Sequence, residues 1–517
     1  MIKTVIKKGA YFDSVSLMQV AKKLNAVPGV LDSAVVMATR ENKGIIKASG
    51  LLTPEILKAG DSDLAIAVSA KTQGDLDAAF KAADELLNKK PAASAGGADR
   101  KASGLDEAVK MLDGANLAVI SVAGRFAGTL AADCLEKNLN VMLFSDNVPV
   151  ETEVELKKAA VKKGLLVMGP DCGTAIINGA PIAFANSVRR GNVGVVAASG
   201  TGAQEVTALV SNEGAGISQC IGTGGRDVKE EVGALTFIQA LKMLAADPGT
   251  EVLLLVSKPP AAGILKKIMA EIKKIRKPVV AVFLGGDVRE KIKDDFYPAK
   301  TLEEAAYKAA CLGKGLKAGK AKEIIYDLNL KAEALAKKEA AKKKKSSCLR
   351  GLFSGGTFVS EAQVILPELI GQVKSNAPLD KKCKLADSMK LSGHAVIDLG
   401  EDEFTVGRPH PMIDFTLRNK MIVSEAARPE VSVLLLDLVL GYGSNLKPLD
   451  DILPPLAAAF KANKELSIVA SVTGTETDPQ VRSKVVKALE AAGVLVMPSN
   501  AGACRLAGEI IRLGSKR

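Results

Sequence analysis

The chain has 517 residues, 47% of them hydrophobic and only 3% aromatic, and its formal net charge is +12. This length predicts several domains with aliphatic cores. The stretch 313–345 alone holds eleven lysines against four acids, and basic patches interleaved with aromatic residues do not occur. We therefore expect no nucleic acid among the partners.

The cysteines and the apolar runs indicate the compartment. The seven cysteines are dispersed, and no C-x-x-C pair or zinc-like spacing occurs, which is typical of a reducing environment. The N-terminus, MIKTVIKKGAYFDS, lacks an apolar signal core. No apolar run reaches the roughly 18 residues that a membrane span requires. We expect a cytoplasmic protein that does not enter a membrane.

Residues 1–90 predict a small α+β domain. Alternating and helical apolar patterns predict strands at Ile2–Ile6, Val35–Ala38 and Leu64–Val68, and helices at Ser14–Leu24 and Gly74–Leu87. The segment PAASAGGAD that follows has the composition of a linker.

Residues 105–190 alternate strand and helix, which predicts a doubly wound, Rossmann-like domain. An apolar run, Ala115–Val122, precedes the glycine-containing turn AGRFAGT. The spacing of Gly124 and Gly128 is not G-x-G-x-x-G, so dinucleotide binding has little support.

Residues 191–312 and 348–517 follow one pattern twice. Each begins with a strand, a Ser-Gly turn and a helix, as in VGVVAASGTGAQE and LRGLFSGGTFVSEAQ, and each later contains a VLLL strand. We interpret this as an internal duplication of a flavodoxin-like domain. The Lys-rich stretch 313–347 between the copies predicts a solvated linker, partly helical or disordered. An arm for an anionic partner is the alternative.

Two strand-to-helix turns are the most informative features, Ser199-Gly200-Thr201-Gly202 and Ser354-Gly355-Gly356-Thr357. A helix opening leaves backbone N–H groups unpaired and carries about half a positive charge. Glycines let a phosphate approach, and Ser and Thr add hydroxyl donors. An ordinary N-cap explains either turn taken singly. Their equivalent places in two copies predict a pair of openings that share one anion.

Several runs resemble a known family. MGPDCGTAIINGAPIAFAN, followed by GNVGVVAASGTGAQE, resembles the α subunit of succinyl-CoA ligase, and residues 350–510 are similar to the last domain of its β subunit. The whole chain resembles the bacterial FdrA proteins, through IKKGAYFDSVSLM, GLLVMGPDCGT, VGRPHPMID and VTGTETDPQ. The resemblance implies an α/β multidomain fold, in which a small N-terminal α+β domain and a Rossmann-like CoA-binding-type domain accompany two flavodoxin-like ligase-type domains.

The resemblance also implies site residues. CoA would approach Gly124 and Gly128, and Asp171 and Cys172 match a family turn near the active site. Cys172 is either a nucleophile or part of a bare turn. The residues that match the family's Gly-Gly-Asp motif are Gly224, Gly225, Arg226 and Asp227.

The positions at which this chain differs from the ligase are more informative about its function than the positions that match. The phosphorylated histidine of the ligase should follow the strand Val279–Leu284, where this chain reads GGDVREKIKDDF, and the chain contains only His394 and His410. At the position of a supporting glutamate stands Ser257-Lys258. An ATP-grasp domain has no room. We therefore do not expect a self-contained ATP-driven ligase.

The remaining candidates form an anion site. Lys258, Arg226 and Arg408 are expected to hold a carboxylate or phosphate. His410, in GRPHP, is a candidate general acid or base, with a structural turn histidine as the alternative. We read His394 as structural.

Three functions follow as hypotheses. The FdrA resemblance implies a component of an oxamate carbamoyltransferase that moves a carbamoyl group between oxalurate and phosphate, with phosphate or carbamoyl phosphate as substrate. The second is an acyl-CoA ligase of the ADP-forming type, using CoA and an ATP-grasp partner. The third is a non-catalytic anion-sensing or scaffold subunit. Partner subunits, a homo-oligomer, or both are expected.

Overall fold

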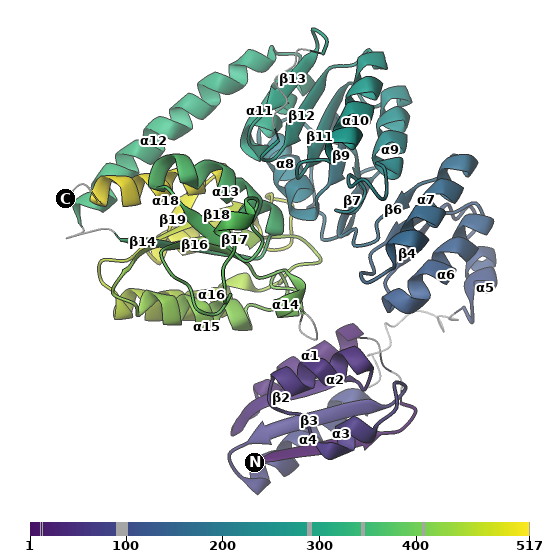
Figure 1. Cartoon of the computed structure of the whole chain (residues 1–517), viewed down its shortest axis with the longest axis vertical. Helices are drawn as coiled ribbons and strands as arrows, with labels where there is room; N and C mark the ends of the chain where they lie inside the picture. Colours follow the sequence, from purple (N-terminus) through teal and green to yellow (C-terminus); the bar gives the residue numbers. More distant parts are fainter. Residues whose placement is uncertain are drawn as a thin grey trace. The chain divides into compact units, whose positions relative to one another are not determined.

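The computed structural model describes residues 1–10, 12, 14–88, 102–286, 292–342, 347–405 and 409–515 (Figure 1). They divide into two compact units, Met1–Ala108 with Glu401–His410, and Val109–Gly400 with Pro411–Arg517. Within these ranges, none of the helices combines the length and apolar character needed to cross a membrane.

The N-terminal unit is built on a three-stranded antiparallel sheet of order β1-β3-β2. Its elements are β1 (Ile2–Lys7), α1 (Ser14–Asn25), β2 (Val30–Met37), α2 (Arg40–Ala48), α3 (Pro54–Lys58), β3 (Leu64–Ala70) and α4 (Gln73–Asn88). Alternate residues of β3 enter two cores, one shared with α1 and α4 and the other with α2 and α3. The sheet is therefore covered on both faces, and the elements predicted from the sequence are present.

A parallel three-stranded sheet of order β4-β5-β6 opens the second unit. Its elements are α5 (Leu105–Met111), β4 (Leu117–Ile120), α6 (Gly124–Glu136), β5 (Asn140–Leu143), α7 (Val150–Lys163) and β6 (Val167–Met168). The hairpin of β7 (Thr174–Ile177) and β8 (Ala180–Ala183) pairs with β10 of the next sheet instead. The chain thus enters that sheet before residue 190, the boundary that the sequence pattern suggested.

The two later sheets share the order of five central parallel strands and differ at one edge. The seven-stranded sheet runs β13-β12-β11-β9-β10-β7-β8, and the six-stranded sheet runs β15-β16-β14-β17-β18-β19. The first contains β9 (Arg190–Ala198), β10 (Ile217–Gly222), β11 (Val252–Ser257), β12 (Val279–Phe283) and β13 (Phe296–Ala299), and the second contains β14 (Cys348–Phe353), β15 (Val373–Ser375), β16 (His394–Asp398), β17 (Val431–Val439), β18 (Ser467–Thr473) and β19 (Leu495–Met497). In chain order, the five-stranded parallel part of the first sheet is 2-1-3-4-5, the flavodoxin-like order. The second sheet is parallel throughout and has the order 2-3-1-4-5-6, which becomes 2-1-3-4-5 when its edge strand β15 is left out. This confirms the predicted fold class.

Helices cover both faces of these sheets (Figure 1). In the first half they are α8 (Gly200–Asn212), α9 (Leu235–Ala246), α10 (Ala262–Lys274) and α11 (Leu302–Gly313), and in the second α13 (Gly356–Ile370), α15 (Thr416–Ala426), α16 (Pro448–Ala462), α17 (Arg482–Ala491) and α18 (Asn500–Gly514). The short helix α14 (Asp402–Thr405) belongs to the unit with residues 1–108. One continuous apolar core takes in α8 and α11 of the first half and α13 and α18 of the second. The helices α9 and α10 cover the other face of the first sheet.

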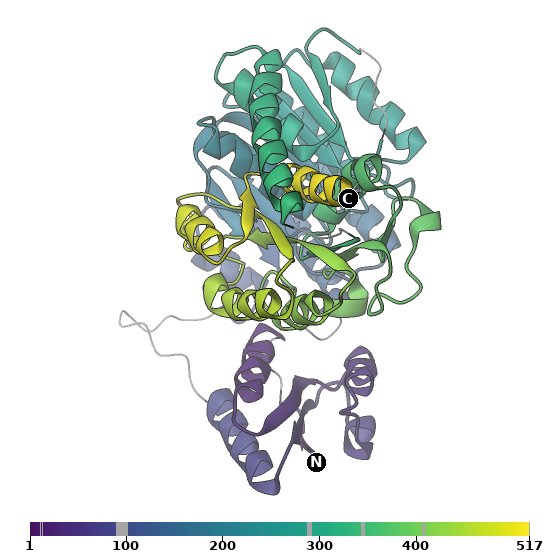
Figure 2. The ribbon, with the colours of Figure 1, turned by 90° about the vertical axis from the view of Figure 1, so that its left-hand side faces the viewer.

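The Lys-rich stretch differs from the solvated linker that its charge predicted. Most of it is the helix α12 (Ala321–Ala341), which lies beside α18 (Figure 2). Ala332, Ala336 and Ala340 recur every four residues and are buried, so one stripe of α12 joins the core while its lysines face solvent. The helix α12 is therefore part of the packing between the halves.

Candidate functional site

The two predicted helix openings lie against each other. The Ser199 and Thr357 hydroxyl oxygens are 2.5 Å apart, and the Thr357 N–H donates to Thr201 Oγ1 at 3.4 Å. A Cβ placed on Gly355 would lie 2.7 Å from Thr201 Cγ2, so the first turns of α8 and α13 are in van der Waals contact. We call this place the junction.

At the opening of α8, backbone donors are left unpaired. Ser199 is the N-cap, and its hydroxyl accepts from Gly202 N at 3.0 Å. Among the described residues, the N–H groups of Gly200 and Thr201 have no hydrogen-bond acceptor. Beside them lies Thr174, 2% exposed, whose hydroxyl also has no partner there. This set of donors can bind an anion.

Lys258 places a positive charge at the same sheet edge. In the parallel pairing of β11 with β9, Ser257 stands opposite Ala198, so Lys258 follows at the level of Ser199. Its side chain is exposed, and no acid among the described residues pairs with it. That Lys258 helps the turn at Ser199 to hold an anion stays a prediction.

The opening of α13 differs from that of α8, because a buried carboxylate takes the donors of its serine. Ser354 is 1% exposed and donates its N–H to Asp437 Oδ1 at 2.8 Å and its hydroxyl to Asp437 Oδ2 at 2.7 Å. Both donors of Ser354 are therefore taken. Among the described residues, the N–H groups of Gly355 and Gly356 have no hydrogen-bond acceptor, so each opening keeps unpaired backbone donors. The sharing of one anion by the two openings stays a prediction.

Arg226 and Asp227 hold domains together instead of lining the junction. Arg226 Nε lies 2.9 Å from Glu153 Oε2, and its Nη2 donates to Val148 O at 2.8 Å. Asp227 is buried and accepts from the N–H groups at the start of α9 and from Lys157. The clamp role predicted for Arg226 is not supported, because its guanidinium is committed to these groups.

The glycines expected near ligands make close backbone approaches. Cβ atoms would lie 2.3 Å from Asp146 O at Gly124, 2.7 Å from Thr152 Cγ2 at Gly128, and 2.4 Å from Pro170 O at Gly224. Gly224 also has a positive φ of 81°, a conformation that favours glycine. Packing accounts for these three, whereas Gly225 has open space around it. Their contact with CoA stays a prediction.

The turn with Asp171 and Cys172 lies beside the first sheet. Asp171 is exposed with a φ of 55°. Cys172 is 3% exposed, and burial raises the pKa of its thiol to about 12. A thiol with this pKa is not a nucleophile at neutral pH.

We therefore expect alkylation of the native protein at pH 8 to spare Cys172 and to label the partly exposed Cys348 and Cys383. Peptide mass spectrometry after brief iodoacetamide treatment measures this. Rapid labelling of Cys172, with Cys220 of the neighbouring core unlabelled as the reference, would restore the nucleophile interpretation.

The remaining predicted residues are not brought to the junction by any described contact. Arg408 lies outside the described residues. His410 belongs to the compact unit with residues 1–108, and burial lowers the pKa of its imidazole to about 4, so it is neutral at pH 7. His394 begins β16 and its Nδ1 accepts from Leu349 N at 3.2 Å, as the structural interpretation expected.

A cluster of buried carboxylates beneath the junction was missed from the sequence. Glu205 and Glu361 each lie six residues after the N-cap of α8 and α13. Glu205 accepts from Asn500 N, the first residue of α18, and Glu361 accepts from Leu302 N, the first residue of α11. Each copy thus caps a helix of the other, and burial raises the pKa of Glu205 to about 7 and that of Glu361 to about 8.

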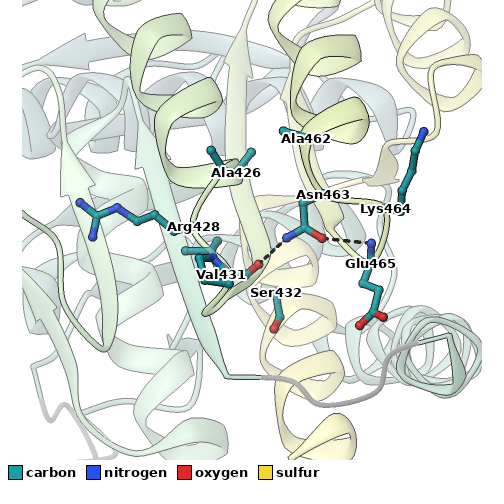
Figure 3. Close-up of a pocket in the computed structure, with 10 residues that line it drawn as sticks. Ala426, Arg428, Val431, Ser432, Ala462, Asn463, Lys464 and Glu465 are labelled. Atoms are coloured by element: carbon teal, nitrogen blue, oxygen red, sulfur yellow. Dashed lines mark hydrogen bonds between the residues drawn. The ribbon is translucent and has the colours of Figure 1, made fainter.

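A pocket of about 410 Å³ lies elsewhere (Figure 3). Asn463 crosses it, donating to Val431 O and accepting from Glu465 N, both at 3.0 Å. It sits where β17 and β18 begin, whereas the helix openings follow the ends of their strands. This pocket is not part of the junction.

The fold and the junction define a CoA-ligase type of protein. Residues 352–510 match the family model described as CoA-ligase, and residues 1–103 match the model described as AllF, heavy metal-associated domain. YahF of Escherichia coli (strain K12) is 41% identical over all of this chain and 99% of its own. The chain belongs to the same family as YahF, the FdrA-like, acyl-CoA-synthetase-like proteins.

Two relatives that match only part of this chain are named as subunits of CoA ligases. SauD of Bilophila wadsworthia, a subunit of an ADP-forming sulfoacetate-CoA ligase, is 27% identical over 33% of this chain and 60% of its own. The α subunit of an ADP-forming succinate–CoA ligase from Methanothermobacter thermautotrophicus is 27% identical over 35% of this chain and 61% of its own. The chain thus spans about three-fifths of these two relatives.

The metal in the description of the N-terminal model finds no suitable ligands here. Soft metals prefer thiolate and imidazole donors, and residues 1–103 contain neither cysteine nor histidine. Among the described residues, no group of three or more His, Cys, Asp or Glu is placed to hold a metal ion. The residues of this domain do not fit a heavy metal.

Proposed function

We propose that the chain is a component of an oxamate carbamoyltransferase, which moves a carbamoyl group between oxalurate and phosphate. The observation that carries the proposal is the α8 opening, where two unpaired N–H groups lie beside the unpaired Lys258. Such preorganised donors hold phosphate and stabilise charge that develops during transfer. No histidine follows β12 to carry a phosphoryl group, so phosphate reacts directly.

The step balances without a further reactant. A phosphate oxygen attacks the carbamoyl carbon of oxalurate, the bond from that carbon to the oxamate nitrogen breaks, and carbamoyl phosphate forms. The proton of the attacking phosphate ends on the oxamate nitrogen. Gly200, Thr201 and Lys258 hold the phosphate during this step.

The test measures the reverse reaction, with purified protein supplied with carbamoyl phosphate and oxamate, alone and with proteins from neighbouring genes. Release of phosphate together with oxalurate supports the proposal. The relatives named as subunits support a need for partners. Absence of turnover with every partner, alongside CoA-dependent ATP hydrolysis, would reject it.

Gly200→Ala is the sharpest variant for this test. Its new Cβ would lie 3.6 Å from Thr174 Oγ1, an ordinary contact, and alanine favours a helix, so folding should be kept. The methyl points toward the helix start and blocks the anion. We expect a loss of activity of at least about 100-fold with an unchanged melting temperature. Full activity would exclude the α8 opening.

Lys258→Gln tests the charge separately. Loss of one exposed cation at a phosphate site should raise the KM for phosphate by roughly 10-fold, with little change in stability. Lys266→Gln, an exposed residue of α10, is the matched control and should leave KM unchanged. Equal effects of the two substitutions would contradict a specific role for Lys258.

A second candidate is an ADP-forming acyl-CoA ligase that works with an ATP-grasp partner, favoured by the similarity to SauD and to the α subunit. His410 would then carry the phosphoryl group. Incubation with labelled ATP and such a partner separates the candidates, because acid-labile label on His410 is expected for the ligase and not for the carbamoyltransferase.

A further inference from the structure

Thr174, the first residue of β7, carries a buried hydroxyl group that is not used by the fold. The side chain is 2% exposed, and among the described residues its Oγ1 has no hydrogen-bond partner. Burying an unpaired hydroxyl is unfavourable, and native proteins contain few such groups. Valine has nearly the same shape and would avoid this cost. A polar group that is kept at a cost to stability is typical of a binding site.

The strand register places Thr174 at the sheet edge where α8 begins. Ile176 of β7 pairs with Cys220 of β10 in an antiparallel ladder. Thr174 therefore lies level with Gly222, the last residue of β10. Gly222 pairs in turn with Ala197 of the parallel strand β9, and α8 begins two residues after β9 ends. A Cβ placed on Gly222 would lie 2.3 Å from Thr174 O, so the backbones are in close contact here.

The Thr174 hydroxyl faces the first turn of α8. A Cβ placed on Gly200 would lie 3.6 Å from Thr174 Oγ1. The N–H groups of Gly200 and Thr201 have no acceptor among the described residues. Three unpaired donors from two separate elements thus lie at one end of α8. An anion bound there would give each of them an acceptor.

The α13 opening differs in its hydroxyl groups. The Ser354 hydroxyl donates to Asp437, and the Thr357 hydroxyl lies 2.5 Å from that of Ser199. In the second sheet the strand at the place of β7 is β15, and its last residue, Ser375, accepts from Ala377 N at 3.1 Å. These hydroxyl groups already have partners, whereas that of Thr174 has none among the described residues.

We propose that Thr174 is a ligand of the phosphate at the α8 opening and places it on the α8 side of the junction. This inference rests on the proposed function and deepens it by adding a ligand from β7, outside both copies of the repeated pattern. A hydroxyl donates to a phosphate oxygen without changing the charge of the site. Its cost in the free protein is offset when the anion binds.

Thr174→Val removes the hydroxyl and nearly keeps the shape of the side chain. We expect the dissociation constant for inorganic phosphate to rise roughly 10- to 100-fold, because a hydrogen bond to a charged group is lost. The melting temperature without phosphate should stay the same or rise by about 1–3 °C, because an unpaired polar group leaves the core. A hydroxyl with a structural role would give the opposite pair of results.

The test determines dissociation constants of the full chain for inorganic phosphate by calorimetry, and melting temperatures without phosphate by circular dichroism. Thr236→Val is the matched control, because Thr236 is also 2% exposed but its hydroxyl donates to Val167 O at 2.9 Å. This control should lower the melting temperature and leave the phosphate affinity unchanged. Thr174→Ser keeps the hydroxyl and should keep the affinity.

The outcomes separate the inference from the proposed function. An unchanged phosphate affinity in Thr174→Val overturns the inference, and so does equal loss of affinity in Thr174→Ser and Thr174→Val. Thr174→Ala also removes the hydroxyl and replaces Thr174→Val if that variant does not fold. Binding that is lost in Gly200→Ala but kept in Thr174→Val would overturn the inference alone. Absence of phosphate binding in the unmodified chain would reject the proposed function itself.

Discussion

Replacing Lys157 with alanine is expected to destabilise the larger unit by about 3–5 kcal/mol. Lys157 is fully buried, and its ammonium lies 2.8 Å from Glu153 Oε1, 2.7 Å from Asp227 Oδ1 and 2.9 Å from Thr223 O. Its removal leaves two buried carboxylates with Arg226 as the one remaining cation in these contacts. The free energy of unfolding is measured from the urea dependence of circular dichroism.

Lys158 supplies the matched control, because it is the next residue on α7 and is exposed. Lys158→Ala should change the stability by less than about 0.5 kcal/mol. Comparable losses in the two variants would show that the buried charges near Asp227 do not depend on Lys157.

We expect the Glu361→Gln variant to be less stable than the unmodified protein at low pH and more stable than it at high pH. Burial raises the pKa of Glu361 to about 8 from 4.5. A carboxyl group whose pKa is higher in the folded than in the unfolded state contributes to the free energy of unfolding. This contribution is complete at a pH below the unfolded-state pKa, and it is lost as the pH rises through the folded-state pKa. The unmodified protein should therefore lose several kcal/mol between pH 5 and pH 9, at about 1.4 kcal/mol per unit of pKa difference.

Glutamine stays neutral at every pH but gives up one of the two acceptors that serve Leu302 N and Asn500 Nδ2. The variant should be less stable at pH 5 and more stable at pH 9. Melting temperatures at both pH values test this, with Glu368→Gln, exposed on the same helix, as the control. Parallel curves for Glu361→Gln and the unmodified protein would contradict the prediction.

Local patterns predicted much of the fold. Apolar runs such as Val252–Ser257 marked the buried strands, and the repeated Ser-Gly turns predicted two flavodoxin-like halves whose helix openings meet. Composition misled at α12, because we judged the stretch by its many lysines and overlooked the helical spacing of Ala332, Ala336 and Ala340. That signal was present in the sequence and could have been used.

The missed parts of the site depend on long-range pairing. We predicted Arg226 to be a free cation because its partner, Glu153, lies far earlier in the chain. Likewise, nothing in the neighbouring sequence indicates that Asp437 accepts hydrogen bonds from Ser354. Glu205 and Glu361 could have been identified from the sequence as equivalent residues. Each stands six residues after the N-cap of its helix, and the two helices occupy the same place in the two copies.

The junction exists only where two halves of one polypeptide meet, and α12 connects them. Covalent connection turns the meeting of the halves into an intramolecular event with an effective concentration set by the connection. The first turns of α8 and α13 therefore stay in contact however dilute the protein becomes. If the same halves were made as separate chains, they would associate only at concentrations above their dissociation constant.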